Sequence, residues 1–135
     1  MSCKSALYVV NTTAGTSIPV GSAIPLTQIV RRFGNGANLN GNTITLLDRG
    51  YYEIDATVTV TATAAGALSV ALYKDGALIP GAISTVTAVA GNTVTLPISS
   101  IVRISCCGDA RANLTLVIGG QAVSTNNAAV TVTKL

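Results

Sequence analysis

Residues 51–63 decide the fold, and they read Tyr-Tyr-Glu-Ile-Asp-Ala-Thr-Val-Thr-Val-Thr-Ala-Thr. Apolar residues occupy the even positions, namely Tyr52, Ile54, Ala56, Val58, Val60 and Ala62, and polar residues occupy the odd positions between them. A period of two places successive side chains on opposite sides of a β-strand, so one face is apolar and the other is hydroxylated or charged. At about 3.3 Å per residue, this strand is ~40 Å long. Such a strand needs a second layer over its apolar face, and this requirement predicts a layered β protein.

The composition bounds the architecture and the surface. The chain has 135 residues, of which 49% are hydrophobic, 4% aromatic and 10% charged, whereas a charged share of about 25% is usual. We expect a single domain over residues 1–135, with residues 1–11 as a candidate N-terminal attachment segment. A surface with so few charges is poorly protected against association. This favours an oligomer that buries apolar surface between subunits over a compact monomer with a neutral coat.

The distribution of charge argues against a nucleic-acid partner, and the short apolar runs argue against a membrane partner. The net charge is +3, and the basic residues are scattered apart from the pair Arg31-Arg32. A nucleic-acid-binding protein usually has a clustered basic stripe with stacking aromatics, so we interpret this pair as a strand end or an interface pair. No apolar run approaches about 18 residues, so no membrane span is predicted. The apolar run at residues 6–10 is shorter than a signal-peptide core, which predicts folding in the cytoplasm of the producing cell.

Few residues could carry chemistry. The chain has no histidine, and its five carboxylates are dispersed. Glu53 and Asp55 share a strand face, which paired-carboxylate chemistry or a calcium site would need, but a solvent-exposed pair among threonines is the simpler interpretation. Cys3, Cys106 and Cys107 are interpreted as free thiols, because cytoplasmic folding argues against a vicinal disulfide. We therefore expect no catalytic residues, no metal site and no cofactor.

Turn residues divide the rest of the chain into short apolar alternations. We predict strands at residues 6–10, 26–33, 43–47, 51–63, 67–74, 82–89, 93–105, 113–118 and 128–133, with a short extended piece at 18–20. Residues 34–42 and 119–127 are predicted as loops, Asp75-Gly76 as a hairpin turn, and residues 26–33 as an edge strand because Pro25 precedes them. Pro97 and Ser99-Ser100 suggest a bulge or bend. Eight to ten strands without a helix favour an all-β jelly-roll sandwich over an immunoglobulin-like one.

Several motifs resemble a known family. Residues 50–54, Gly-Tyr-Tyr-Glu-Ile, and residues 72–76, Leu-Tyr-Lys-Asp-Gly, resemble the G-Y-Y/F-x-I/V … L-x-x-N/D-G pattern of C1q/TNF-like jelly rolls. Residues 8–12 and 18–20 resemble the opening strands in the C-terminal heads of collagen-like spore-surface glycoproteins, and residues 130–135 resemble their last strand. Similar small domains occur as bacteriophage capsid decoration and fibre-head proteins.

The resemblance implies ten strands in two sheets, packed as a compact threefold trimer with a largely apolar inter-subunit surface. The candidate positions for the trimer interface or the core are Tyr51, Tyr52, Ile54, Val58, Val60, Val130 and Val132. The chain departs from the family because it has no collagen-like stalk and lacks the acidic loop clusters that bind calcium in some C1q heads. No metal site is therefore carried over.

Two functions remain open at this stage. The first is a non-enzymatic homotrimeric decoration or cement protein on the virion surface of a bacteriophage, with itself and the major capsid protein or another virion protein as partners. The segment with Lys4 and Tyr8 is then the candidate attachment segment. The alternative is a receptor- or glycan-binding head of a phage fibre or of a bacterial spore or cell-surface protein. In that case exposed Tyr51 or Tyr73 are candidates for stacking on a host surface glycan, although packing within the sheet is the simpler role for both.

Overall fold

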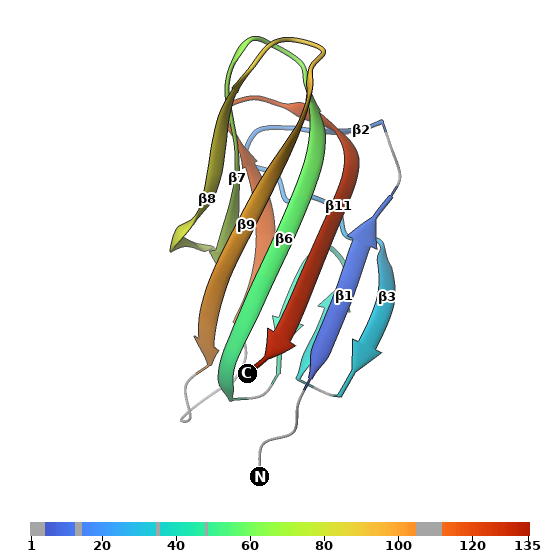
Figure 1. Ribbon diagram of the computed structural model, residues 1–135, viewed down its shortest axis with the longest axis vertical. Coiled ribbons are helices and arrows are strands. Elements are labelled where there is room, and N and C mark those ends of the chain that lie inside the picture. Colours follow the sequence, from blue (N-terminus) through green and yellow to red (C-terminus); the bar gives the residue numbers. More distant parts are fainter. Residues whose placement is uncertain (1–4, 13–14, 35, 48, 105–111) are drawn as a thin grey trace.

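The computed structural model describes residues 5–12, 15–34, 36–47, 49–104 and 112–135. These residues form eleven strands and no helix. The strands make two antiparallel sheets that lie face to face, and the long strands run along the long axis of the molecule (Figure 1). The predicted all-β jelly-roll sandwich is confirmed, with one strand more than the upper bound expected from the turn signals.

The first sheet has six strands. The order is β3-β1-β11-β6-β9, and β2 pairs with the beginning of β11. The bounds of these strands are β1 Ala6–Asn11, β2 Thr16–Ile18, β3 Gln28–Phe33, β6 Gly50–Ala62, β9 Thr93–Ile104 and β11 Val123–Lys134. The strand predicted at residues 26–33 is β3, and it lies at the sheet edge as expected.

The second sheet has five strands in the order β4-β5-β10-β7-β8. The bounds are β4 Ala37–Asn40, β5 Thr43–Leu46, β7 Gly66–Lys74, β8 Ala77–Ala88 and β10 Ala112–Gly119. The predicted hairpin joins β7 to β8, where Asp75 and Gly76 have φ angles of 51° and 85° between the paired residues Lys74 and Ala77. Two consecutive positive φ angles match the twist of the flanking strands, which explains the Asp-Gly sequence.

Strand β6 is the central element of the first sheet. It pairs with β11 on one side and with β9 on the other along nearly its whole length. Its side chains alternate as predicted, because every even position from Tyr52 to Ala62 is buried against the second sheet. The opposing sheet contributes Leu68, Leu72, Leu114 and other aliphatic side chains to the same core. Burial of this apolar surface is the main source of stability.

A buried polar network closes the core at the end where β1 begins. The hydroxyl of Tyr52 donates to the carbonyl oxygen of Gly36 at 3.1 Å, and the Gly36 amide donates to the Ser5 hydroxyl at 2.9 Å. The amide of Lys134 donates to the Ser5 carbonyl oxygen at 2.8 Å. Buried polar groups are costly without partners, so this network lets the Tyr52 ring fill the core while its hydroxyl stays bonded.

Three predicted boundaries are wrong. Residues 34–42, predicted as a loop, contain β4, which pairs with β5 across a turn at Gly41-Asn42. The predicted loop at residues 119–127 contains the beginning of β11, where Val123 and Thr125 are buried. Strand β8 begins at Ala77 rather than at residue 82. In each case a partner strand supplies the hydrogen bonds, and this tertiary pairing overrides the local preference of Gly and Asn for turns.

The bulge predicted near Pro97 is also absent. The register between β6 and β9 is unbroken from Gly50 opposite Ile104 to Thr61 opposite Thr93. Strand β9 lies at the sheet edge, where a residue without an amide hydrogen is tolerated. The first sheet has two irregularities that the sequence did not indicate. The register of β11 with β6 shifts between Thr125 and Asn127, and the register of β1 with β3 shifts between Tyr8 and Val9.

Two glycines provide a matched test of packing at the turns. Gly120 and Gly91 have similar φ angles of 85° and 83°, but only Gly120 approaches another strand. A Cβ atom on Gly120 would overlap the Ala67 carbonyl group, whereas a Cβ on Gly91 would have no neighbour within 4 Å. We expect Gly91→Ala to lower the free energy of unfolding by about 1–2 kcal/mol. Gly120→Ala should cost about 1–3 kcal/mol more because of the overlap.

Urea denaturation of both variants measures this difference. Equal losses in the two variants would show that the contact between Gly120 and Ala67 does not constrain the turn.

Candidate functional site: a threonine-rich face and an edge groove

The outward side of the six-stranded sheet is a continuous surface over β1, β11, β6 and β9. Register places its residues in rows across the sheet, for example Tyr8 opposite Thr131, Thr131 opposite Asp55, and Asp55 opposite Ser99. We call this surface the threonine-rich face. Its members are Thr57, Thr59, Thr61, Thr93, Thr95, Thr131 and Thr133, together with Tyr8, Tyr51, Glu53, Asp55, Ser99, Ile101 and Arg103.

Many hydroxyl groups of this face are bonded to each other along the sheet. Thr59 and Thr95 share a hydrogen bond of 3.2 Å between their hydroxyls, and Thr61 and Thr93 share one of 3.1 Å. The Ser99 hydroxyl donates to a carboxylate oxygen of Asp55 at 2.8 Å. Polar groups that already have partners lose less when water is removed. This face is therefore easier to desolvate than its polar composition indicates.

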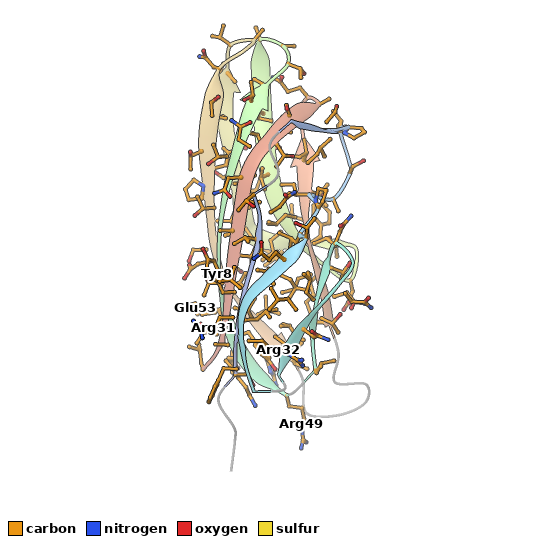
Figure 2. The ribbon with its side chains drawn as sticks, turned by 90° about the vertical axis from the view of Figure 1, so that its right-hand side faces the viewer. Tyr8, Arg31, Arg32, Arg49 and Glu53 are labelled. Atoms are coloured by element: carbon orange, nitrogen blue, oxygen red, sulfur yellow. The ribbon has the colours of Figure 1, made fainter. Side chains whose placement is uncertain are left out.

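The charges of the face separate by strand. The carboxylates of Glu53 and Asp55 lie on central β6, Arg103 lies on edge strand β9, and Arg31 lies beside Tyr8 on edge strand β3. Figure 2 shows Tyr8, Arg31 and Glu53 on the same side of the sheet. Arg32 has a different role, because its Nε donates to the carbonyl oxygen of Ala37 at 3.1 Å and so links β3 to β4 of the other sheet. Neither Arg31 nor Arg32 has an ion pair among the residues that the structure describes.

Large apolar side chains are exposed at the end of this face where β6 begins. Tyr51, Ile101 and Phe33 are 53%, 59% and 63% exposed, and Phe33 lies opposite Ala6 on the edge strand. Tyr8 is 38% exposed in the adjacent row. Single exposed apolar residues are ordinary, but several on one face indicate a surface that another molecule covers.

A groove runs along the edge of the molecule where β8 of one sheet meets β9 of the other. It encloses about 280 Å³ and is lined by Lys74, Ala77, Leu78, Ile79, Pro80, Ile101, Val102 and Arg103. The ammonium group of Lys74 donates to the Arg103 carbonyl oxygen at 3.1 Å and bridges the two sheets. This edge groove is thus apolar with a basic rim, and it adjoins the threonine-rich face through Ile101.

The structure separates the residues that the sequence grouped as interface or core. Tyr52, Ile54, Val58, Val60, Val130 and Val132 lie in the core with at most 1% of their surface exposed. Tyr51 lies on the threonine-rich face, and Tyr73 is half-buried on the outward side of β7. Whether Tyr51 contacts a second subunit stays a prediction.

Only part of the candidate attachment segment lies within the residues that the structure describes. Residues 6–11 form β1, which is held between β3 and β11, and Tyr8 projects onto the threonine-rich face. Lys4 lies outside the described residues, as do Cys3, Cys106 and Cys107. Attachment through this segment stays a prediction.

Sequence reasoning missed Phe33 and gave Ile101 no role. Ile101 was visible as the one apolar residue at a polar position in the alternation of residues 93–105, and the structure places it at the junction of face and groove. Nothing in the sequence indicated that Phe33 is exposed. Its exposure follows from the position of β3 at the edge of the sheet, where all six residues of the strand are exposed.

The described residues contain no cluster of three or more Cys, Asp or Glu side chains that could hold a metal ion. The same residues include no helix long and apolar enough to cross a membrane.

Comparison with solved structures identifies the fold. The chain is similar to murine APRIL over 98% of its length and 100% of that chain, with 12% identity and a TM-score of 0.75. It is similar to PRD1 vertex protein P5 over 97% of this chain and 96% of that chain, with 20% identity and a TM-score of 0.59. The globular domain of zebrafish complement 1qA matches over 98% and 96%, with 10% identity and a TM-score of 0.66.

No protein-family model and no curated protein matches the sequence. Identities as low as those to the solved structures establish the fold alone. The chain has a C1q/TNF-like jelly roll, as its motifs at residues 50–54 and 72–76 predict.

An exchange between neighbouring residues of β6 tests the assignment of its two faces. Val58 is fully buried, whereas the adjacent Thr57 is exposed on the threonine-rich face. Val58→Thr places an unpartnered hydroxyl in the core and should lower the free energy of unfolding by about 2 kcal/mol. Thr57→Val keeps the branched shape and should change it by less than about 0.5 kcal/mol.

Urea denaturation at equal protein concentration compares the two variants. A loss in Thr57→Val as large as that in Val58→Thr would contradict the assignment of the faces.

Proposed function

We propose that the protein is a non-enzymatic structural protein that assembles as a homotrimer and decorates the capsid surface of a bacteriophage. The observation that carries this proposal is the threonine-rich face, a largely uncharged surface with exposed Tyr51, Ile101 and Phe33 at one end. The likeness to PRD1 vertex protein P5 supports the virion part of the proposal, because that protein is named for its place at a vertex.

The presence of two different patches on one chain, the threonine-rich face and the edge groove, supports assembly as a closed ring. In a cyclic trimer each subunit presents one surface to its first neighbour and a different surface to its second neighbour. The threonine-rich face carries the carboxylates of Glu53 and Asp55, and the edge groove carries the cation of Lys74 and shares Arg103 with the end of that face. We infer that the face of one subunit packs against the edge groove of the next, where opposite charges and apolar side chains meet.

The energetics of such an interface follow from the composition of the face. Removal of apolar surface from water contributes roughly 25 cal/mol for each Å², and Ile101 and Phe33 are more than half exposed. A face rich in lysine and glutamate would oppose this through desolvation. Here four of the seven threonine hydroxyls, those of Thr59, Thr61, Thr93 and Thr95, have partners within the sheet, which lowers the cost of burial.

The topology suggests how a trimer would sit on a shell. Strand β1 begins and β11 ends at the same end of the molecule, since Ala6 lies opposite Thr133. Residues 1–5, with Lys4, precede β1 in the chain. Attachment through them to the major capsid protein or another virion protein would leave the turns at the far end directed away from the shell. Synthesis in the host cytoplasm followed by passive binding to the shell is consistent with this arrangement.

Lysine substitutions at two exposed isoleucines on different sheets test the assembly surface. We expect the wild-type particle to have three times the 13.6 kDa mass of the chain in sedimentation equilibrium. Ile101→Lys should shift the mass to that of a single chain, because it places a charge at the junction of face and groove. Ile83→Lys is the matched control, since Ile83 is 50% exposed on the outward side of the other sheet.

Circular dichroism of each variant shows that it is folded before its mass is interpreted. A wild-type protein of single-chain mass would overturn the homotrimer. Dissociation by both lysine variants would place the interface elsewhere.

Capsid binding is tested with empty shells assembled from the major capsid protein of the genome that carries this gene. We expect the trimer to sediment with these shells at a fixed and saturable ratio. A form that begins at Ser5 should remain trimeric but bind at least about tenfold more weakly, a loss of about 1.4 kcal/mol. A trimer that ignores the shells and is retained on host cells would support the adhesive head instead.

A further inference from the structure

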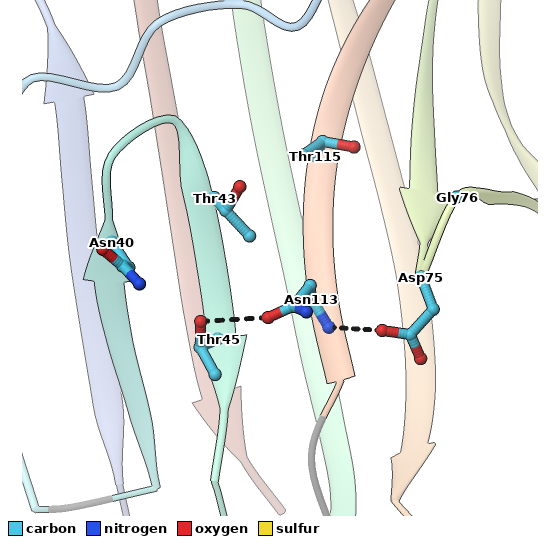
Figure 3. A pocket seen from close by; sticks show the side chains of 7 residues that line it. All are labelled: Asn40, Thr43, Thr45, Asp75, Gly76, Asn113 and Thr115. Carbon is cyan, nitrogen blue, oxygen red and sulfur yellow. Dashed lines mark hydrogen bonds between the residues drawn. The ribbon is translucent and has the colours of Figure 1, made fainter.

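A polar hollow lies on the outward side of the five-stranded sheet, away from the threonine-rich face. It is open to solvent, with a volume of about 530 Å³, and lies between β4, β5, β10 and the turn that joins β7 to β8 (Figure 3). Its lining side chains are Asn40, Thr43, Thr45, Asp75, Asn113 and Thr115. Asp75 supplies the one charge in this lining, which contains neither lysine nor arginine.

Hydrogen bonds within the lining hold Asn113 and Asp75 in place. The backbone amide of Asn113 donates to a carboxylate oxygen of Asp75 at 2.9 Å. The backbone amide of Asp75 donates to the backbone carbonyl oxygen of Asn113 at 2.8 Å. The hydroxyl of Thr45 donates to the side-chain oxygen of Asn113 at 3.2 Å. Groups fixed before binding lose little conformational entropy when a ligand arrives.

The remaining polar atoms of the lining are available to a ligand. With its side-chain oxygen accepting from Thr45, Asn113 presents its NH₂ group as a donor. The second carboxylate oxygen of Asp75 and the hydroxyls of Thr43 and Thr115 have no hydrogen-bond partner among the described residues. The hollow thus offers an anionic acceptor, an amide donor and two hydroxyls that can act as either.

We propose that this hollow binds a neutral saccharide. Two adjacent hydroxyls of a sugar can donate to Asp75 and accept from Asn113, and the threonines can bond to further hydroxyls in either direction. The volume lies within the roughly 300–1,000 Å³ typical of small-ligand sites. The lining has no cation to offset the Asp75 carboxylate. This carboxylate would repel the negative charge of a sialylated or sulphated sugar, so such sugars are disfavoured.

An aromatic side chain lies next to the hollow. Tyr73 is half-buried on the outward side of β7, directly opposite Thr115 in the register with β10. Its ring lies on the same side of the sheet as the lining residues and can pack against the apolar face of a sugar ring. The saccharide site goes beyond the proposed assembly role and does not depend on it, since the threonine-rich face belongs to the other sheet.

The test uses the full-length ¹⁵N-labelled protein and the methyl glycosides of glucose, galactose, mannose and N-acetylglucosamine as probes. We expect at least one glycoside to shift the amide resonances of Gly76, Asn113 and Thr115 in a saturable way. A glycan array with neutral and anionic oligosaccharides provides the second measurement, and neutral glycans should give the highest signals.

Two variants connect binding to the hollow. Asp75→Asn preserves the turn, because Asn tolerates the φ angle of 51°, and it should weaken binding at least about tenfold since a hydrogen bond to a charged group is lost. Thr115→Val removes one hydroxyl and should weaken binding about threefold or more. Thr85→Val, an exposed position of β8 outside the lining, is the matched control and should bind like the wild type.

Several results would overturn the proposal. These are the absence of any saturable shift together with an empty array, shifts that cluster away from Gly76 and Asn113, and wild-type affinity in Asp75→Asn. Highest signals from anionic glycans would overturn the neutral class of ligand. Since Ile101→Lys leaves the hollow intact, saccharide binding by this variant is expected even when the trimer is lost, and the two proposals can fail separately.

Discussion

The pairing of β6 with β11 on one side and β9 on the other is the interaction on which the rest of the structure depends. It runs almost the whole length of the strand and so fixes which side of the six-stranded sheet faces the core. A shift of one residue would exchange the buried and exposed sets, moving Val58 into water and Glu53 into the core. The second sheet covers the apolar side, and the other side remains as a surface with few charges.

The buried and exposed sides of this sheet connect stability with the proposed assembly. The same alternation that fills the core leaves a face rich in threonine, with two hydroxyl pairs, on which Glu53 and Asp55 are the acidic groups. Low charge would be a liability for a monomer, but it suits a surface that a neighbouring subunit covers. The edge groove with Lys74 and Arg103 supplies a complementary partner on the same chain. The low charge of the sequence and the proposed assembly are thus both explained by an outer face that a neighbouring subunit covers.

Much of the fold could be predicted because its signals are local. Alternation at residues 51–63 marks the central strand, and Asp75-Gly76 marks a hairpin whose φ angles only a few residues tolerate. Strand β4 could not be predicted, because Gly and Asn at residues 34–42 favour turns until β5 supplies a partner. Little of the candidate sites was visible, since the groove and the polar hollow join residues from strands far apart in sequence. Ile101 was the exception, because it breaks an otherwise regular pattern.

The sequence by itself determined the fold class, the two faces of the central strand and the absence of histidine chemistry. These properties depend on side-chain period and composition, which each segment carries without reference to the others. The tertiary structure alone decided that the hydroxyl of Tyr52 bonds to the carbonyl oxygen of Gly36 inside the core. It alone brought Asp75 within hydrogen-bond distance of Asn113. Long-range strand pairing sets such proximities, and no local pattern encodes which strands become neighbours or in which register.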